Sequence, residues 1–317
     1  MANFVEPIMY GIDVSLRTLD IAQPDERVAS IANTESAVAD WLKTVPQGAG
    51  IAIEATSHYH ELVLDQALEA GLTVYIINGK QLRHYREAVG PRAKTDVQDA
   101  HLLRRYLCHE YQQLTPVKPL NDKQKQLWRL LKRRAMLVKV RTQIHSSMKG
   151  DVQAKQLSQG VMIELNRTIR QLEKLMRELA VELGWGRWLA HCQSIPGIGP
   201  LNALALVVCF HRGTFRRVDQ FIAYIGLDVR VRDSGQMKGK RKLTKRGESE
   251  IRRLLYNAAM SFARNPQYKP LYDRMRDRGM SSTAAYVALA RKLARIAFAL
   301  MVKDVDFEHN QMRMACK

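Results

Sequence analysis

Residues 8–13 read IMYGID, a short apolar run that ends on the carboxylate of Asp13. Residues 50–54 read GIAIE and repeat the pattern, ending on Glu54. Short apolar runs that alternate with helical segments are typical of buried strands in an α/β sheet. A carboxylate at the end of a buried strand is costly unless it is paired or binds a metal ion. The two runs therefore predict a sheet and a candidate metal site at the ends of its strands.

The flanking sequence favours a layered sheet with helices packed on it. Residues 19–22 alternate like a second strand, and residues 72–77 resemble a further buried strand. Residues 34–42 and 60–70 have helical spacing, and Gly71 ends the second of these helices. We expect residues 1–115 to form one α/β domain.

A second acidic pair follows in residues 94–103, KTDVQDAHLL. Thr95 is expected to cap a helix, and the i,i+3 spacing places Asp96 and Asp99 on one face of it. An acid at a helix start is more often a cap or a partner of the helix dipole. The combination of two strand-end acids with this pair favours a site instead, and four oxygen donors suit Mg²⁺ or Mn²⁺.

The charge of the chain points to a polyanionic partner. The 317 residues contain 50 Lys and Arg against 31 Asp and Glu, a net charge of +19. Basic side chains that neutralise phosphates release condensed counterions, so nucleic acid is the expected partner. A membrane surface is the other interpretation, but neither an amphipathic anchor nor a lipidation signal is evident. Four scattered cysteines and the lack of a signal-peptide pattern favour the cytoplasm.

Residues 116–188 are expected to form a helical arm. Residues 123–149 contain nine Lys or Arg and no acid, with apolar residues at helical spacing. A second helical pattern over residues 163–183 predicts that two long helices fold back into an antiparallel coiled coil. A basic helix face can simply be solvated, yet phosphate contact would relieve its self-repulsion. The candidate nucleic-acid contacts of the arm are Lys132, Arg133 and Arg134.

Residues 189–317 are expected to form a mainly helical domain. It opens with SIPGIGP at residues 194–200, which resembles the hairpin of a helix–hairpin–helix element. Gly197 and Gly199 would let backbone N–H groups approach a phosphate at the start of the next helix. A Gly- and Pro-rich linker is the alternative interpretation.

A basic loop at residues 230–247 is the least ordinary segment of this domain. Cations there could stabilise the charge that develops when Ser234 attacks a phosphodiester. Serines in basic loops are more often turn formers or phosphate contacts, and chemistry alone does not prefer Ser234 to Ser249 or Ser261. The candidate phosphate contacts of the loop are Lys240, Arg241, Lys242, Lys245 and Arg246.

Seven strings, in this order along the chain, resemble motifs of the DEDD transposases. This family comprises insertion-sequence family one-ten with its eleven-eleven branch, together with the Piv pilin-gene invertases. The strings are YGIDVS (10–15), IEAT (53–56), KTDVQDA (94–100), SIPGIG (194–199), GL (226–227), DSG (233–235) and GxxxIRRLLY (247–256). The resemblance spans nearly the whole chain. It implies an RNase H-like (RuvC-like) N-terminal domain, a coiled-coil arm and a C-terminal transposase domain.

The resemblance also implies roles for single residues. Asp13, Glu54, Asp96 and Asp99 match the acidic tetrad that holds Mg²⁺, and Ser234 matches the serine that forms a covalent link to DNA. Members of the family assemble the acids and the serine from different protomers, which implies a dimer or tetramer. Insertion-sequence members use a noncoding bridge or seeker RNA as a guide on double-stranded DNA. The invertases share the same motifs, so the motifs alone do not imply a guide RNA.

Three further interpretations remain open on the sequence. A RuvC-like junction nuclease would use the four acids with water and would not need Ser234. A sugar-kinase or actin-like ATPase also begins with a strand and Gly-Ile-Asp, but it requires a phosphate loop that residues 14–17 lack. A non-enzymatic helix–hairpin–helix protein explains the charge but leaves four acids without a role.

Overall fold

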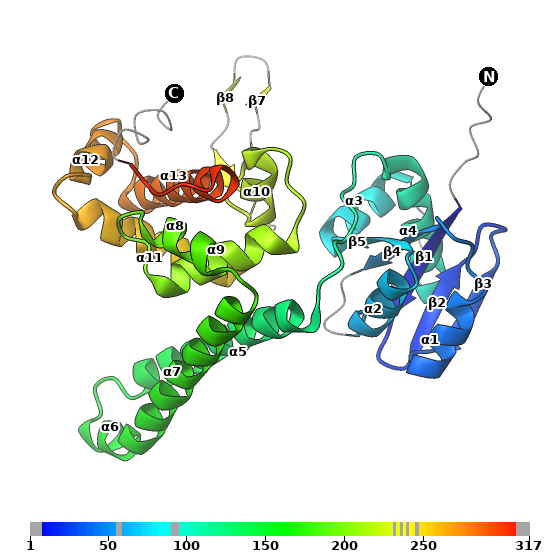
Figure 1. Ribbon diagram of the computed structural model, residues 1–317, viewed down its shortest axis with the longest axis horizontal. Helices are drawn as coiled ribbons and strands as arrows, with labels where there is room; N and C mark the ends of the chain where they lie inside the picture. Colours follow the sequence, from blue (N-terminus) through cyan, green and yellow to red (C-terminus); the bar gives the residue numbers. More distant parts are fainter. Residues whose placement is uncertain are drawn as a thin grey trace. The chain divides into compact units, whose positions relative to one another are not determined.

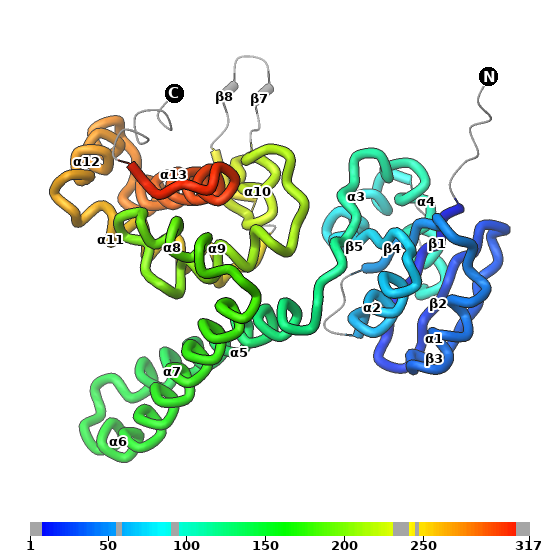
Figure 2. The backbone as a smooth tube through the Cα atoms, in the orientation of Figure 1, coloured from blue at the N-terminus to red at the C-terminus, as the bar shows by residue number. Residues whose placement is uncertain are grey.

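The computed structural model describes residues 8–54, 59–89, 95–230, 233–234, 237–238, 241–244 and 247–308. The chain divides into two compact units, Met1–Pro119 and Leu120–Lys317, and Figures 1 and 2 trace them in ribbon and tube form. The expected arm and the helical region after it fall in one unit. The domain boundaries at residues 115 and 188 stay predictions.

The first unit is built on a five-stranded mixed sheet. Its strands are β1 (Met9–Val14), β2 (Thr18–Ala22), β3 (Val28–Ala32), β4 (Gly50–Glu54) and β5 (Thr73–Ile77). Their order is β3-β2-β1-β4-β5. The central strand β1 pairs antiparallel with β2 and parallel with β4, so the strand that carries Asp13 and the strand that ends on Glu54 are neighbours; Asp13 is the last residue but one of β1 rather than its end.

Helices cover both faces of this sheet, because side chains on a strand alternate between its two sides. The helices α1 (Glu35–Leu42) and α2 (Glu61–Glu69) pack on one face against the β1 side chains of Tyr10, Ile12 and Val14. The helices α3 (Gly79–Val89) and α4 (Asp96–Glu110) pack on the other face, together with Met9. The mixed α/β unit confirms the class of fold expected for the N-terminal part of the chain.

Gly11 of β1 lets α4 lie directly on the sheet. A Cβ at this position would clash with the carbonyl of Ala100 and the backbone nitrogen of Arg104, both on α4. Arg104 fixes the contact further, because its Nε donates to the carbonyl of Met9 at 3.1 Å. The close approach brings the acidic first turn of α4 to the strand that carries Asp13.

The second unit is mainly helical. Its helices are α5 (Asp122–Ser147), α6 (Val152–Leu157), α7 (Gln159–Glu182), α8 (Gly186–Gln193), α9 (Pro200–Arg212), α10 (Val218–Tyr224), α11 (Ser249–Arg264), α12 (Lys269–Asp277) and α13 (Ser282–Lys303). Helices α5 and α7 run side by side as an arm that projects from the remaining helices (Figure 1). Among the described helices of the chain, none is long and apolar enough to cross a bilayer.

A buried ion-pair cluster fixes the base of the arm. Arg134 of α5 is 9% exposed and lies 2.9 Å from Glu173 of α7 and 3.0 Å from Glu250 of α11. Nearby, the guanidinium of Arg212 stacks over the ring of Trp128, 4.3 Å from its centroid. A buried charge is tolerated only when it is paired, so Arg134 binds the arm to the helical body.

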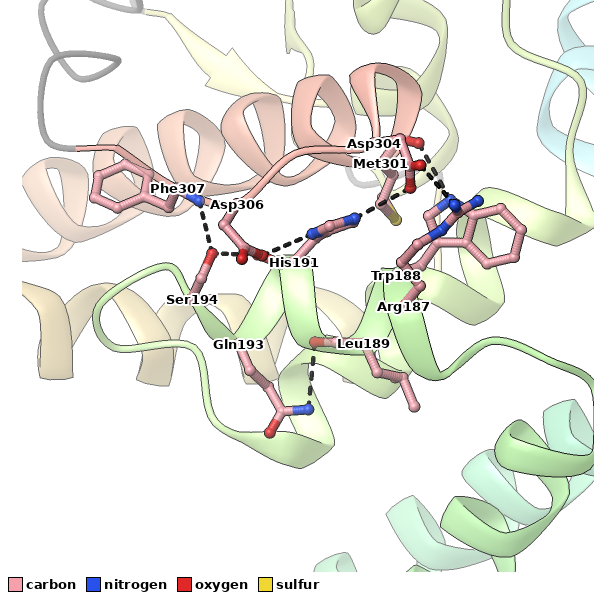
Figure 3. A network of polar contacts seen from close by, with 10 residues as sticks. All are labelled: Arg187, Trp188, Leu189, His191, Gln193, Ser194, Met301, Asp304, Asp306 and Phe307. Atoms are coloured by element: carbon pink, nitrogen blue, oxygen red, sulfur yellow. Dashed lines mark hydrogen bonds and ion pairs between the residues drawn. The ribbon is translucent and has the colours of Figure 1, made fainter.

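A polar network holds the hairpin between α8 and α9 against the segment that follows α13 (Figure 3). The ring of His191 lies between two carboxylates, 2.7 Å from Asp306 and 3.1 Å from Asp304. Ser194 Oγ donates to the carbonyl of His191 and accepts from the backbone nitrogen of Phe307. The network anchors the hairpin that carries Gly197.

Candidate active site

Asp13 faces the layer of α3 and α4. It lies two residues beyond Gly11 on β1, so it projects to the same side of the sheet as the glycine that α4 covers. In the antiparallel ladder, Asp13 pairs with Asp20 of β2. Side chains of directly paired residues share one face, so these two carboxylates lie next to each other.

Glu54 ends β4, the parallel neighbour of β1. Ile12 of β1 pairs with Ile53 of β4. Asp13 and Glu54 each follow these paired residues by one position, so they lie side by side on neighbouring strands. Its carboxylate lies against the first residue of α3, because a Cβ at Gly79 would clash with it. The expected strand-end position of Glu54 is therefore confirmed.

The first turn of α4 presents the other two acids. Thr95 caps the helix, with its Oγ1 accepting from the backbone nitrogen of Gln98 at 3.3 Å, as the sequence predicts. Asp96 is exposed, whereas Asp99 is only 5% exposed. Asp99 is paired in this buried position by the guanidinium of Arg86 on α3.

The acids act on one another electrostatically. The pKa of Asp13 is raised from 3.8 to about 6, first by burial and then by the negative charges of the neighbouring acids. In decreasing order these are Asp99, Asp96, Glu54 and Asp20. The other three predicted carboxylates thus lie near enough to Asp13 for their charges to act on it. The structure adds Asp20, whose nearness follows from the β1–β2 register and from no local sequence signal.

The residues of this site fit a hard divalent cation by type. All are carboxylates, and their repulsion of Asp13 is a charge imbalance that a cation would relieve. Within the described part of the chain, however, no three Asp, Glu, His or Cys side chains converge closely enough to hold one ion as they stand. Coordination by the tetrad therefore requires side-chain adjustment and stays a prediction.

We expect affinity for Mg²⁺ or Mn²⁺ to fall as the pH drops through about 6. Carboxylate ligands must lose their proton to bind a cation, and the pKa of Asp13 is about 6. One competing proton weakens binding about tenfold between about pH 7 and pH 5. Calorimetric titration with Mn²⁺ at the two pH values checks this. Equal affinities would remove Asp13 from the ligands.

The described residues of the segment that contains Ser234 form two short antiparallel ladders. The strands β6 (Val229–Arg230) and β9 (Lys242–Leu243) pair at its base, and β7 (Asp233–Ser234) pairs with β8 (Met237–Lys238). Ser234 is described for its backbone alone. The base is closed by a hydrogen bond from Thr244 to Asp228 and by one from Arg252 to the carbonyl of Gly247.

The candidate nucleic-acid contacts have different surroundings. Lys132, Arg133, Arg241 and Lys242 are exposed, whereas Lys240, Lys245 and Arg246 lie outside the described residues. Arg134 is committed to Glu173 and Glu250, which favours a role in fixing the arm over one in binding phosphate.

The two hairpin glycines differ as well. Gly197 has a φ of +83° and packs against the backbone of α11, where a Cβ would clash with Phe262. Gly199 is the N-cap of α9, and no atom obstructs its Cβ position. The backbone of Gly197 is thus fixed by packing, while a contact of either glycine with phosphate stays a prediction.

Comparison with known proteins places these residues in a family. Residues 10–155, which contain all four acids, match the DEDD transposase model of the IS110 group, described as Transposase. Residues 190–273, which contain Ser234, match a second model, described as Transposase IS116/IS110/IS902 family. The chain belongs to the IS110 family of transposases.

Individual relatives of this IS110-family chain extend the match. The pilin gene-inverting protein of Moraxella bovis is 28% identical over 94% of this chain and 97% of its own length. The corresponding protein of Moraxella lacunata is 29% identical over 81% of each chain. The transposase for insertion sequence element IS1111A of Coxiella burnetii is 35% identical over 36% of this chain and 33% of its own length. The chain is thus an enzyme of the DNA transposase and recombinase class.

Proposed function

We propose that this chain is a site-specific DNA recombinase of an insertion sequence, which cuts and rejoins DNA through a covalent link to Ser234. The observation that carries the proposal is the packing of β1 between β4 and α4, which brings the elements that carry Asp13, Glu54, Asp96 and Asp99 together, and the charges of these acids raise the pKa of Asp13. These acids belong to a chain with a net charge of +19, which suits a phosphodiester substrate. The mixed α/β sheet beneath them supports an RNase H-like domain.

The chemistry conserves phosphoester bonds. The Oγ of Ser234 attacks a backbone phosphorus and loses its proton to solvent, while one P–O bond breaks and the departing oxygen takes up a proton. In the joining step, a hydroxyl of another strand attacks the same phosphorus and releases the serine. Mg²⁺ or Mn²⁺ bound by the four acids would stabilise the charge on the reacting oxygens. No ATP is needed, because the number of phosphoester bonds is unchanged.

The partners in this proposal are double-stranded DNA, a noncoding guide RNA and further copies of the chain. Exposed cations on α5 support contact with a nucleic-acid backbone, and Arg129, Arg133 and Lys139 are all exposed. A dimer or tetramer supplies the acids and Ser234 from different protomers, as in the family that the sequence resembles.

Site-specific inversion without a guide RNA is the second candidate. Two relatives that match most of this chain are named pilin gene-inverting proteins, and the first matches 97% of its own length. The named transposase relative matches only 33% of its own length. Inversion uses the same cutting and rejoining steps, so the acids and Ser234 would have the same roles.

The test is strand transfer by the purified chain on DNA that carries its own flanking sequences, with Mg²⁺ and with a chelator. We expect rejoined products only with the metal ion, and full activity in chelator would refute the metal-dependent mechanism. Nucleic acid that co-purifies is sequenced in parallel. A discrete RNA that matches flanking noncoding DNA supports guided transposition, whereas full activity after ribonuclease treatment supports unguided inversion.

A further inference from the structure

Helix α3 turns one face toward the acidic site. Gly79, Leu82 and Arg86 are spaced i, i+3 and i+7, so they form one stripe along the helix. Leu82 is 1% exposed and packs into the core beneath the sheet with residues of α4. The stripe is therefore the buried face of α3, and its two ends lie at carboxylates of the site.

The first end of the stripe meets Glu54. The Cα of Gly79 packs so closely on the Glu54 carboxylate that a Cβ would overlap Oε1. Any larger residue at position 79 would displace this carboxylate, since glycine alone lacks the Cβ. The start of α3 thus sets how far the Glu54 side chain extends.

The second end of the stripe meets Asp99. Nη2 of Arg86 contacts Oδ1 of Asp99, and the two side chains are 21% and 7% exposed. Charge-assisted hydrogen bonds to a carboxylate are among the strongest that proteins make, and they fix its orientation. Because Arg86 contacts Oδ1, the second oxygen of Asp99 can serve another partner.

Arg86 also lowers the local excess of negative charge. Asp13 follows Gly11 on β1 by two residues, and Gly11 packs on the backbone of Ala100, the residue after Asp99, so the two carboxylates belong to neighbouring segments and repel each other. A guanidinium on Oδ1 of Asp99 offsets part of this repulsion, and the pairing uses only one of the two carboxylate oxygens. Partners of this kind orient metal ligands from behind in many metal sites.

We propose that α3 is the positioning element of the carboxylate site. Arg86 holds Asp99 in the orientation that lets it share a divalent cation with Asp13, and Gly79 sets the position of Glu54. Arg86 is a positioning residue, because it acts through Asp99 and touches no reacting atom. The inference rests on the proposed metal-dependent function and assigns it a residue outside the four acids.

The test measures Mn²⁺ binding to the full-length chain by isothermal titration calorimetry. We expect Arg86→Gln to weaken binding about ten- to hundredfold, as is usual when a partner behind a metal ligand is removed. Arg86→Lys keeps the charge and should recover part of the affinity. The matched control is Arg83→Gln on the same helix, since Arg83 is 65% exposed and pairs with Glu87 of α3 at 3.8 Å.

Gly79→Ala gives an independent variant at the other end of the stripe. The added Cβ should displace Glu54 and weaken Mn²⁺ binding, and circular dichroism establishes that each variant is folded. Unchanged or tighter binding by folded Arg86→Gln would overturn the inference, because tighter binding would make Arg86 a competitor of the cation. No Mn²⁺ binding by the unmodified chain would instead refute the proposed metal-dependent function, and the inference with it.

Discussion

Asp13→Asn should reduce strand transfer by about a hundred- to a thousandfold, the scale seen when a group that stabilises transition-state charge is removed. Asparagine keeps the shape of the side chain but lacks the charge that attracts a cation. Nucleic-acid binding should persist, because the proposed contacts are basic side chains elsewhere in the chain. The variant should also unfold at a higher temperature at neutral pH. The pKa of Asp13 in the folded chain is about 6, so ionised Asp13 opposes folding above that pH.

The control for this variant is Asp40→Asn on α1, where the carboxylate is exposed and pairs with Lys43 at 2.7 Å. It should leave strand transfer and thermal stability close to those of the unmodified chain. Gel-based strand-transfer assays and thermal unfolding followed by circular dichroism measure the two effects. Normal strand transfer by Asp13→Asn would show that the acids do not form the reaction centre.

Ser234→Ala should abolish covalent protein–DNA adducts. Alanine has no hydroxyl oxygen, so no phosphoester bond to residue 234 can form. Metal binding should be unchanged, because the four acids belong to the other unit of the chain. Adducts are detected as labelled DNA that stays with the protein in denaturing gels. The expected result is a complete loss of this signal.

Ser261→Ala is the matched control, since Ser261 is an exposed serine on α11 of the same unit. It should form adducts at the normal level. Adducts in Ser234→Ala would place the nucleophile at another residue. If both the unmodified chain and Ser234→Ala cut DNA normally and neither forms adducts, the RuvC-like nuclease is supported, in which water attacks the phosphodiester.

Local patterns in the sequence predict much of the fold. Glu54 ends its strand and Asp13 lies next to the end of its own, as expected. A short apolar run between polar segments is typical of a buried strand, so the end of the run marks the end of the strand. Thr95 caps α4 as predicted, since capping depends on neighbours three residues away. The antiparallel pairing of α5 with α7 also follows from the helical spacing of their apolar residues.

The features that the sequence does not reveal depend on contacts between distant segments. Helix α3 has Leu82 as its one buried residue and is otherwise rich in charged and polar side chains, so its sequence gives a weak signal. The pairing of Arg86 with Asp99 depends on the packing of α3 on α4 and has no local sequence signal. Asp20 approaches Asp13 because of a strand register that a turn sets. Arg134 resembles its basic neighbours in sequence, and only Glu173 and Glu250 distinguish it.

The ion pairs of Arg134 hold the arm at its base, and the rest of the arm extends beyond them. Helix α5 has 26 residues, and the part beyond Arg134 extends for about 20 Å at ~1.5 Å per residue. If Arg134 were removed, a tilt of about 10° at its position would move the end of α5 by about 3.5 Å. Loss of one buried guanidinium would thus have its largest effect on position at the far end of the arm, distant from the substitution itself.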